Sequence, residues 1–369
     1  MVTPRYLPHI GGIETHVHEV GPRLVNSGIN LTVLTTEPNL QHSLLPRAEV
    51  SEGMRILRVR SWPPGHDYYI APEIYSTIEQ GRWDLVHCQG CHTFVPIFAM
   101  LGAKKAKVPY LVTFHGTGGH SSRIRIRLRS TQWKLLHPLL ANASKLIAVS
   151  HFEADYFRNL LRLPAEHFSV VPNGVSLPSA THLPLRTSNQ SLIISVGRLE
   201  RFKGHHHLIS AIPKIREWRS DARLLILGTG PYEATLRELA QKIGIAEYVE
   251  IRSIPPGDRK TMAETLSQAA LVALLSEYES HPLAVMEALA LRRPVLVADT
   301  SGMRELAKQG LVRAIPPNSS PEEIARAVRK QIEEPIIPPA HLVLPTWDDC
   351  ASQLQIIYEA SIRRNQCVS

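Results

Sequence analysis

The sequence lacks any apolar run near the roughly 18 residues that a membrane-spanning helix requires. Its longest apolar stretch, residues 94–103, contains a proline and a glycine and is typical of a buried helix. No apolar signal segment opens the chain either, because an arginine, a proline and a Gly-Gly pair lie within the first twelve residues. These absences predict a cytoplasmic protein.

Cysteine is scarce, with four in 369 residues. Cys88 and Cys91 form a C-x-x-C behind an expected strand, a spacing that some redox sites share. A second such pair is missing from the sequence, so a structural zinc site has no support, and nothing else in it indicates redox chemistry. We interpret both cysteines as small, semi-buried side chains.

Neither sign of charge dominates, although 41 Lys and Arg against 33 Asp and Glu leave a net charge of +8. Residues 1–175 contain 18 Lys and Arg against 12 Asp and Glu, a net charge of +6. The remainder contains 23 Lys and Arg against 21 Asp and Glu, a net charge of +2. This excess favours anionic partners such as nucleotide phosphates, acidic glycans or anionic lipid surfaces. We recognise no nucleic-acid module and expect no nucleic-acid partner.

Short β-branched apolar runs alternate with helical patterns, which predicts βαβ units and parallel sheets. The runs are apolar throughout, as strands covered on both faces should be. The expected strands cover residues 31–35, 85–87, 110–114, 146–149, 192–196, 224–227, 249–251, 270–275 and 295–298.

The length of the chain predicts two domains. Residues 177–189 are rich in Pro, Ser, Thr and His without periodicity, which predicts a linker. Residues 1–4 resemble the end of a first strand with little before it, whereas a strand usually runs about five to six residues. We therefore expect a truncated first strand, two Rossmann-like domains and a last helix that returns to the first domain, at residues 1–176, 190–340 and 341–369.

Two loops could approach an anion. Gly11 and Gly12 directly precede a helix, where small residues let the backbone come close to a charged ligand, although a plain turn explains them equally well. Arg198 and Lys203 follow an expected strand and could neutralise a diphosphate at its carboxyl end. A solvated basic loop is the alternative for this segment.

A third segment places two carboxylates around the start of a helix. Pro282 suits the first helical position, and Glu287 then shares a face with Leu283 among apolar neighbours. A carboxylate there is costly unless something donates hydrogen bonds to it, and sugar hydroxyls are suitable donors. Glu279 would reach the same ligand from its other side. The alternative is that Glu287 lies at a wet domain edge.

These segments resemble a known family. Glu279-Ser-His-Pro-Leu-Ala-Val-Met-Glu287 matches the two-glutamate signature of the retaining GT-B glycosyltransferases of family four, and Gly197–Gly204 resembles its G-R-L-x-x-x-K-G. The glycine loop, the strand-end histidine, the segment entering the linker and the G-x-x-E are represented, in family order, by Gly11-Gly12, Thr113–Gly116, Val171–Val175 and Ser301–Glu305.

The resemblance implies an α/β, GT-B fold in which two Rossmann-like domains face across a cleft, with the acceptor on the first and the nucleotide on the second. It implies that Arg198 and Lys203 hold the donor diphosphate, and that Glu287 holds the ribose. Glu279 and His115 would contact the transferred sugar while the glycine loop closes over the phosphates. Further donor-side and acceptor-side residues are expected to be Leu283, Ile254, Ser150 and Asn173.

The activity implied is transfer of a hexose, with retention, from a UDP-sugar or less readily a GDP-sugar. The acceptor would be a lipid, glycan or small metabolite, as in cell-envelope or polysaccharide biosynthesis. The leaving phosphate assists the acceptor hydroxyl in such enzymes, so no dedicated base, metal or cofactor is expected, and we find no paired aspartates of the kind that would hold a metal. The alternatives are a non-catalytic sugar-nucleotide binder or partner subunit, and a Rossmann oxidoreductase or epimerase, whose full G-x-G-x-x-G is missing.

Departures from the family pattern limit these inferences. Ser280-His281-Pro282 replaces the usual Gly-Phe-Gly, and proline removes one backbone donor to phosphate. Ser176 stands where an aspartate is common. Ser253 stands where a glycine is usual, which leaves base recognition open.

Two further patterns have competing interpretations. Arginines at every second position from Arg123 to Arg129, followed by Lys134, could form a basic helix that docks peripherally on the inner, anionic face of a membrane. Spacing of two spreads them around a helix, so a solvated helix or an acceptor-site wall is favoured. The run His205–His207 begins a helix, and consecutive side chains point apart, which argues against shared metal ligation.

Overall fold

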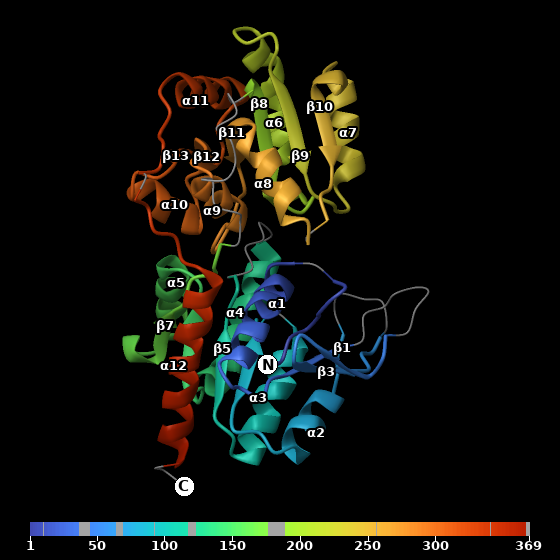
Figure 1. Cartoon of the computed structure of the whole chain (residues 1–369), viewed down its shortest axis with the longest axis vertical. Coiled ribbons are helices and arrows are strands. Elements are labelled where there is room, and N and C mark those ends of the chain that lie inside the picture. Colours follow the sequence, from blue (N-terminus) through green and yellow to red (C-terminus); the bar gives the residue numbers. More distant parts are fainter. Residues whose placement is uncertain are drawn as a thin grey trace. The chain divides into compact units, whose positions relative to one another are not determined.

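The computed structural model describes residues 1–9, 11–36, 45–63, 69–91, 93–116, 123–175, 189–255, 257–339 and 341–366, without the side chains of residues 123–131 and 189–190. The chain divides into two compact units, residues 1–174 with 345–369 and residues 175–344 (Figure 1). The expected linker lies outside the described residues except for residue 189, which begins a strand.

The first unit contains a largely parallel sheet. Its strands are β1 (Thr32–Thr36), β2 (Ala48–Ser51), β3 (Met54–Val59), β4 (Val86–Gln89), β5 (Tyr110–Thr113), β6 (Lys145–Ala148) and β7 (Phe168–Val170). They pair in the orders β1-β3-β2 and β4-β5-β6-β7. Val2 forms parallel bridges to Leu34 of β1 and Cys88 of β4, so the expected first strand is present as a short central connection.

Helices cover this sheet and close the unit. They are α1 (Gly12–Asn26), α2 (Glu73–Gln80), α3 (Phe94–Ala106), α4 (Arg123–Ala141), α5 (His151–Leu161) and α12 (Trp347–Gln366). The last of these packs against α1, where Arg23 Nε lies 2.8 Å from Asp348 Oδ1. Figure 1 shows α12 in red beside the elements of the first unit, more than 170 residues away in sequence from α5.

The start of α12 is fixed by a close backbone contact. A Cβ atom on Gly174 would lie 2.1 Å from Trp347 N, a separation that backbone atoms cannot accommodate. We therefore expect Gly174→Ala to displace α12 and lower the stability of the first unit by about 3 kcal/mol, in the range of overpacked cores. Gly257→Ala, whose added Cβ would meet nothing within 4 Å, is the control. Urea unfolding of both variants measures the difference, and equal midpoints would contradict the prediction.

The second unit contains a six-stranded parallel sheet in the order β10-β9-β8-β11-β12-β13. Its strands are β8 (Asn189–Val196), β9 (Arg223–Leu227), β10 (Val249–Arg252), β11 (Ala269–Leu274), β12 (Val295–Ala298) and β13 (Arg313–Ile315). The first strand of the unit, β8, therefore lies beside the fourth, β11, and the order reverses between them. Ligands of such sheets bind at the carboxyl ends of the strands at this reversal.

Both faces of this sheet are covered. The helices are α6 (His205–Arg216), α7 (Glu233–Lys242), α8 (Arg259–Ser267), α9 (Leu283–Ala290), α10 (Ser301–Lys308) and α11 (Pro321–Glu333). One apolar cluster joins the sheet to α6, α7 and α11, and a second joins it to α8, α9 and α10. Every residue of β11 is buried, as the uninterrupted apolar run predicted.

All nine expected strands are present, with ends shifted by at most three residues. Four strands were missed, namely β2, β3, β7 and β13. In β3 buried apolar residues alternate with exposed Arg55 and with Arg58, which removed the uninterrupted apolar signal on which the prediction depended. Among the described residues, no helix is both long and apolar enough to cross a membrane.

The cysteines are more deeply buried than the sequence suggested. Cys88 and Cys91 are free thiols inside the core of the first unit rather than semi-buried, because Cys88 lies in the fully buried β4 and Cys91 packs in the same apolar cluster. Burial raises the pKa of the Cys88 thiol to about 12, and it also raises the pKa of the Cys91 thiol. Both sulfurs therefore stay protonated at neutral pH and act as apolar packing groups.

Candidate functional site

The loop that follows β8 is held by close backbone packing. Gly204, at the amino end of α6, has a φ of 74°, and a Cβ there would lie 2.0 Å from Leu275 O. A Cβ on Gly228 would lie 1.9 Å from Gly197 O. Glycine is thus required at both positions, and the loops after β8, β9 and β11 meet at the carboxyl end of the sheet.

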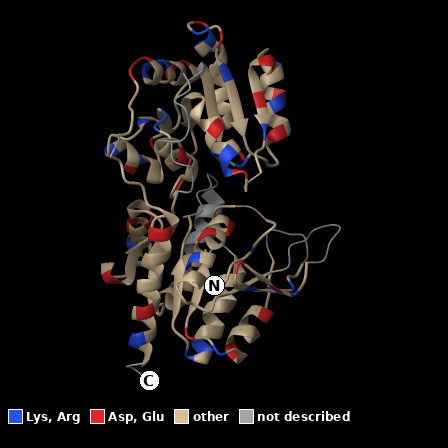
Figure 2. Cartoon of the chain, in the orientation of Figure 1, with Lys and Arg blue, Asp and Glu red and all other residues tan. Residues whose placement is uncertain are grey.

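Lys203 and Glu279 form an ion pair at this end of the sheet. Lys203 Nζ lies 2.5 Å from Glu279 Oε1, and the two side chains are only 16% and 14% exposed. The hydroxyl of Ser276 donates to the same carboxylate oxygen at 3.1 Å, and Glu279 N donates to Ser301 Oγ at 2.8 Å. Basic and acidic residues accordingly lie together at the lower end of this unit in Figure 2. The structure places two of the expected site residues in direct contact.

Arg198 belongs to the same loop but faces solvent. Its side chain is 61% exposed, and Nη1 lies 2.7 Å from Glu200 Oε1. The backbone beneath it is supported by buried His205, whose Nδ1 lies 2.9 Å from Ser195 Oγ and whose Nε2–H reaches Arg198 O at 3.3 Å. Burial lowers the pKa of His205 to about 4, so the ring is neutral and serves as a support. Within the described ranges, no group of three or more His, Cys, Asp or Glu could hold a metal ion.

Glu287 is buried, and the interpretation that it is wet is wrong. It lies on α9 at 8% exposure and forms an ion pair with Arg259, the first residue of α8. Burial raises the pKa of the Glu287 carboxyl, and the Arg259 guanidinium opposes that shift. Sequence reasoning missed Arg259, because one arginine in a basic chain forms no pattern. The available signal was its place after Asp258, whose side chain caps α8.

The remaining donor-side residues border these pairs. Leu283 is half-buried and is the first residue of α9, so Pro282 is its cap and not, as expected, its first helical position. Ile254 is half-buried in the loop after β10 and packs against the core cluster of α8 and α9. The loops after β8 and β10 and helix α9 therefore carry the expected nucleotide-side residues of the second unit, whereas Gly11 and Gly12 lie in the first unit.

The first unit gathers its own polar residues at the carboxyl ends of its strands. His115 follows β5 with a φ of 57°, and its Nε2–H donates to Gln89 Oε1 at 2.6 Å. Its ring lies 4.7 Å from that of His16, whose Nδ1–H donates to Asn173 Oδ1 at 2.8 Å. Burial lowers the pKa of His16 to about 4, so the His16 ring is neutral at neutral pH.

This cluster connects the expected residues His115 and Asn173 through two that sequence reasoning missed. His16 lies one turn into the helix that begins at Gly12, so Gly11 and Gly12 position it. Gln89 ends β4, and its amide nitrogen lies 3.3 Å from His87 Nδ1. The position of Gln89 at a strand end was the signal available for finding it.

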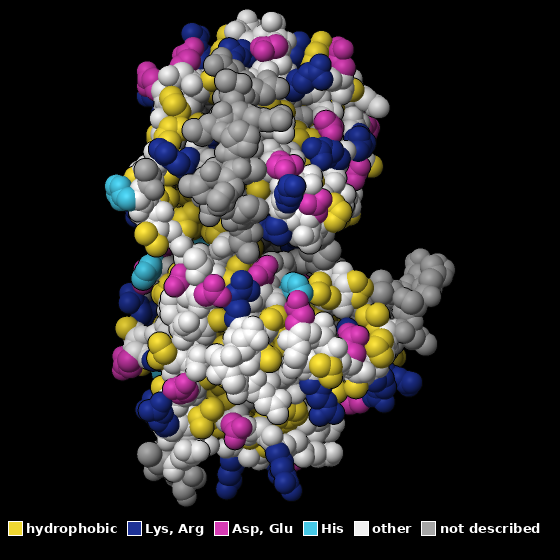
Figure 3. All heavy atoms as spheres, in the orientation of Figure 1, with side chains coloured by type: hydrophobic (Ala, Val, Ile, Leu, Met, Phe, Trp, Pro, Cys, Tyr) yellow, Lys and Arg dark blue, Asp and Glu magenta, His cyan; other side chains and the backbone are white. Residues whose placement is uncertain are grey.

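The two remaining predictions concern Ser150 and the basic stretch from Arg123 to Lys134. Ser150 is buried at the end of β6, where its hydroxyl accepts from Glu153 N at 3.2 Å and caps α5. The basic stretch lies in α4, but the side chains of residues 123–131 are outside the described residues, and Lys134 is exposed. On the face drawn in Figure 3, the coloured basic and acidic side chains are interspersed over both units.

Two family descriptions match consecutive parts of the chain. Residues 10–178 match Glycosyltransferase Family 4, and residues 184–342 match Glycosyl transferases group 1. The first match covers the glycine loop and the His115 cluster, and the second covers the two ion pairs of the second unit.

Individual proteins show the same relationship. An uncharacterized glycosyltransferase of Methanocaldococcus jannaschii is 26% identical over 90% of this chain and 88% of its own length. Glycogen synthase of Mycobacterium tuberculosis is 27% identical over 91% and 86%. Sucrose-phosphate synthase from Thermosynechococcus elongatus has a TM-score of 0.69 at 20% identity, covering 97% of this chain and 92% of that one. Anabaena HepE in complex with UDP-glucose has a TM-score of 0.68 at 18% identity, covering 100% and 96%.

Proposed function

Because the chain belongs to the glycosyl transferases of group 1 and has the GT-B fold, we propose that it transfers a hexose from a nucleotide-diphosphate sugar. We favour a UDP-sugar as donor and keep a GDP-sugar as the alternative. The acceptor is a hydroxyl of a lipid, glycan or small metabolite, which we assign to the first unit. The nucleotide is assigned to the second unit.

The Lys203–Glu279 ion pair carries this proposal. It lies where the strand order reverses between β8 and β11, the position at which sheets of this order bind ligands. Without a donor, the two groups neutralise each other. A bound diphosphate would take the charge of Lys203 and free the Glu279 carboxylate to accept from sugar hydroxyls. The pair thus exchanges one internal ion pair for two contacts to the donor.

We propose that the reaction proceeds with retention and without a metal or a protein base. The bond from the anomeric carbon to the diphosphate oxygen breaks, and a bond to the acceptor oxygen forms on the same face of the sugar. The acceptor proton passes to the leaving phosphate. Lys203 and Arg198 stabilise the negative charge that develops there, while His115 contacts the sugar. Proton NMR of the product tests retention, since its anomeric configuration must equal that of the donor.

Titration calorimetry with UDP, GDP and NAD tests the donor assignment. We expect saturable UDP binding that weakens about 100-fold in Glu287→Ala, because two hydroxyl hydrogen bonds to a charged group contribute about 3 kcal/mol together. Glu264→Ala removes an exposed carboxylate from α8 and serves as the matched control.

Each alternative has its own result in this experiment. Binding of NAD in place of UDP would replace the proposal with a Rossmann oxidoreductase or epimerase. Binding of UDP with no transfer from UDP-sugars to any acceptor class would leave a non-catalytic sugar-nucleotide binder.

A further inference from the structure

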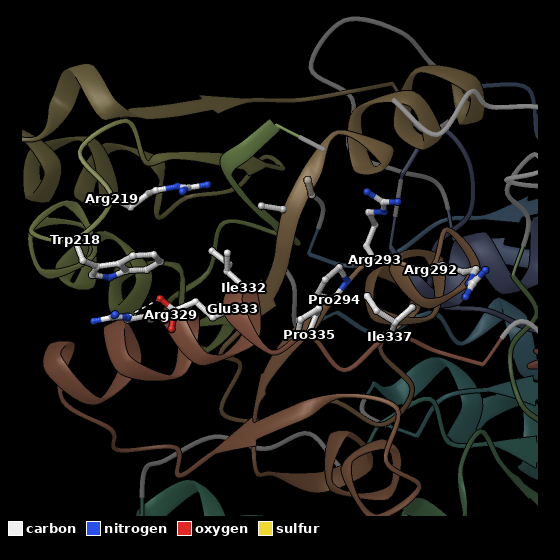
Figure 4. Close-up of a pocket in the computed structure, with 12 residues that line it drawn as sticks. Trp218, Arg219, Arg292, Arg293, Pro294, Arg329, Ile332, Glu333, Pro335 and Ile337 are labelled. Carbon is white, nitrogen blue, oxygen red and sulfur yellow. Dashed lines mark hydrogen bonds and ion pairs between the residues drawn. The ribbon is translucent and has the colours of Figure 1, made fainter. Parts of the chain in front are cut away.

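A polar pocket opens on the second unit at the amino ends of its strands (Figure 4). Its volume is about 580 Å³. The small side chains of Ala269 and Ala270, at the start of β11, leave room at its floor. Its walls come from the connections that precede β9 and β12 and from the end of α11. The residues proposed for donor binding follow the opposite, carboxyl ends of the same strands.

Positive charge dominates the lining of this pocket. Four arginines and one glutamate line it, a net charge of +3: Arg219, Arg292, Arg293, Arg329 and Glu333. Arg329 Nε lies 2.8 Å from Glu333 Oε1 on the same helix, and Arg219 Nε lies 3.5 Å from Asp221 Oδ1. Neither Arg292 nor Arg293 forms an ion pair with a carboxylate among the described residues.

Arg293 carries a partly desolvated charge. It is half-buried, and its guanidinium donates to the carbonyl oxygens of Ser267 at 3.1 Å and Leu291 at 3.2 Å. Carbonyl dipoles compensate a partly desolvated cation less fully than an anion would. This burial lowers the pKa of Arg293, which agrees with an incompletely compensated charge. An anion in the pocket would relieve that cost.

The wall of the pocket opposite Arg293 contains an aromatic side chain, Trp218. Figure 4 shows the Trp218 ring and the Arg219 guanidinium directed toward the middle of the pocket from one side, with Arg293 and Pro294 on the other. Arg329 Cζ lies 5.6 Å from the centre of the Trp218 ring. Ile332 and Ile337 add apolar lining. The pocket thus combines cations with an aromatic and apolar wall.

We propose that this pocket binds a small phosphorylated metabolite, with its phosphate at Arg293 and its organic part toward Trp218. Guanidinium groups match phosphate oxygens geometrically, and the volume exceeds that of a single inorganic phosphate. The pocket is separate from the proposed donor site, because the two lie at opposite ends of the strands and the length of the sheet separates them. The inference does not depend on the transferase activity.

Calorimetric titration with inorganic triphosphate and with glucose 6-phosphate tests the site. We expect Arg293→Gln to weaken binding at least ten-fold, and Arg292→Gln to weaken it in the same direction. Glutamine retains a donor for Ser267 O, and thermal unfolding checks that the variant is folded. Arg326→Gln removes the same charge from the exposed face of α11, outside the pocket, and should leave the affinity unchanged.

The variant Lys203→Ala distinguishes binding at one end of the sheet from binding at the other. Binding that survives in Lys203→Ala and is lost in Arg293→Gln assigns the phosphate to the new pocket. Binding that is lost in Lys203→Ala and survives in Arg293→Gln assigns it to the donor end and overturns the proposal. Failure of both probes to bind, or equal weakening by Arg326→Gln, overturns it as well.

Discussion

Lys203→Ala is expected to lower kcat by about 1000-fold. The ammonium group lies at the carboxyl end of β8, where the donor diphosphate is proposed to bind, and the leaving phosphate would lose its least exposed positive charge. Removal of one preorganised charge-stabilising donor typically lowers kcat by roughly 100-fold to 1000-fold. Steady-state kinetics with a UDP-sugar and any competent acceptor measures the loss.

The same substitution has a structural cost that must be measured separately. Glu279 is 14% exposed and would lose its cation, which is expected to cost about 1–3 kcal/mol of folding free energy. Lys214→Ala is the matched control, because Lys214 also forms an ion pair, with Glu217 at 2.8 Å, but on the exposed side of α6. If both Lys203→Ala and Lys214→Ala retained the wild-type kcat, the proposed role of Lys203 would be wrong.

Acidification between pH 6.5 and pH 4 is expected to unfold the protein steeply. Burial lowers the pKa of His16 to about 4 and places that of His87 well below its usual value, both in the first unit. In this range the unfolded chain binds a proton at each histidine that the folded unit does not bind. Stability therefore falls with falling pH, by about 1.4 kcal/mol per pH unit for each histidine.

Two such histidines remove about 3 kcal/mol per pH unit from the first unit, a large share of the 5–15 kcal/mol that typically holds a domain together. Buried His205 in the second unit, whose pKa is also lowered to about 4, contributes there in the same direction. Urea unfolding followed by fluorescence at pH 7, 6 and 5 measures both units, whose transitions need not coincide.

The variant His16→Asn tests whether protonation of His16 causes this pH dependence of stability. His16→Asn keeps a donor for Asn173 but does not titrate, so the slope of stability against pH in the first unit should decrease by about 1.4 kcal/mol per pH unit. His18→Asn replaces a more exposed ring on the same helix and serves as the control. An unchanged slope in His16→Asn would show that this histidine is not the source.

Local sequence was sufficient for much of the fold and part of the site. The strands of both sheets were predictable where they are covered on two faces, because burial there demands an uninterrupted apolar run. Glu279 and Glu287 were identifiable as candidate site residues because both lie within one strand–loop–helix segment. In contrast, β2 lies at a sheet edge and is largely exposed, so its sequence carries no such run.

Contacts between distant segments were beyond such reasoning. Arg259 and Glu287 are 28 residues apart, and His16 and Asn173 are 157 apart, so no sequence pattern links either pair. Gln89 and Arg259 are single polar residues that belong to no recognisable sequence motif. Their roles depend on which partner the fold brings within hydrogen-bonding distance.

The sequence by itself determined the two-unit α/β architecture, the strands that form it and the loops that carry the charged residues, since apolar periodicity and glycine spacing act over a few residues. Tertiary structure alone decided that Lys203 pairs with Glu279, that His115 lies against His16, and that Arg293 is half-buried beside a pocket. Ion pairing, pKa shifts and pockets arise from the distance and burial of groups far apart in the chain, and only folding fixes those quantities.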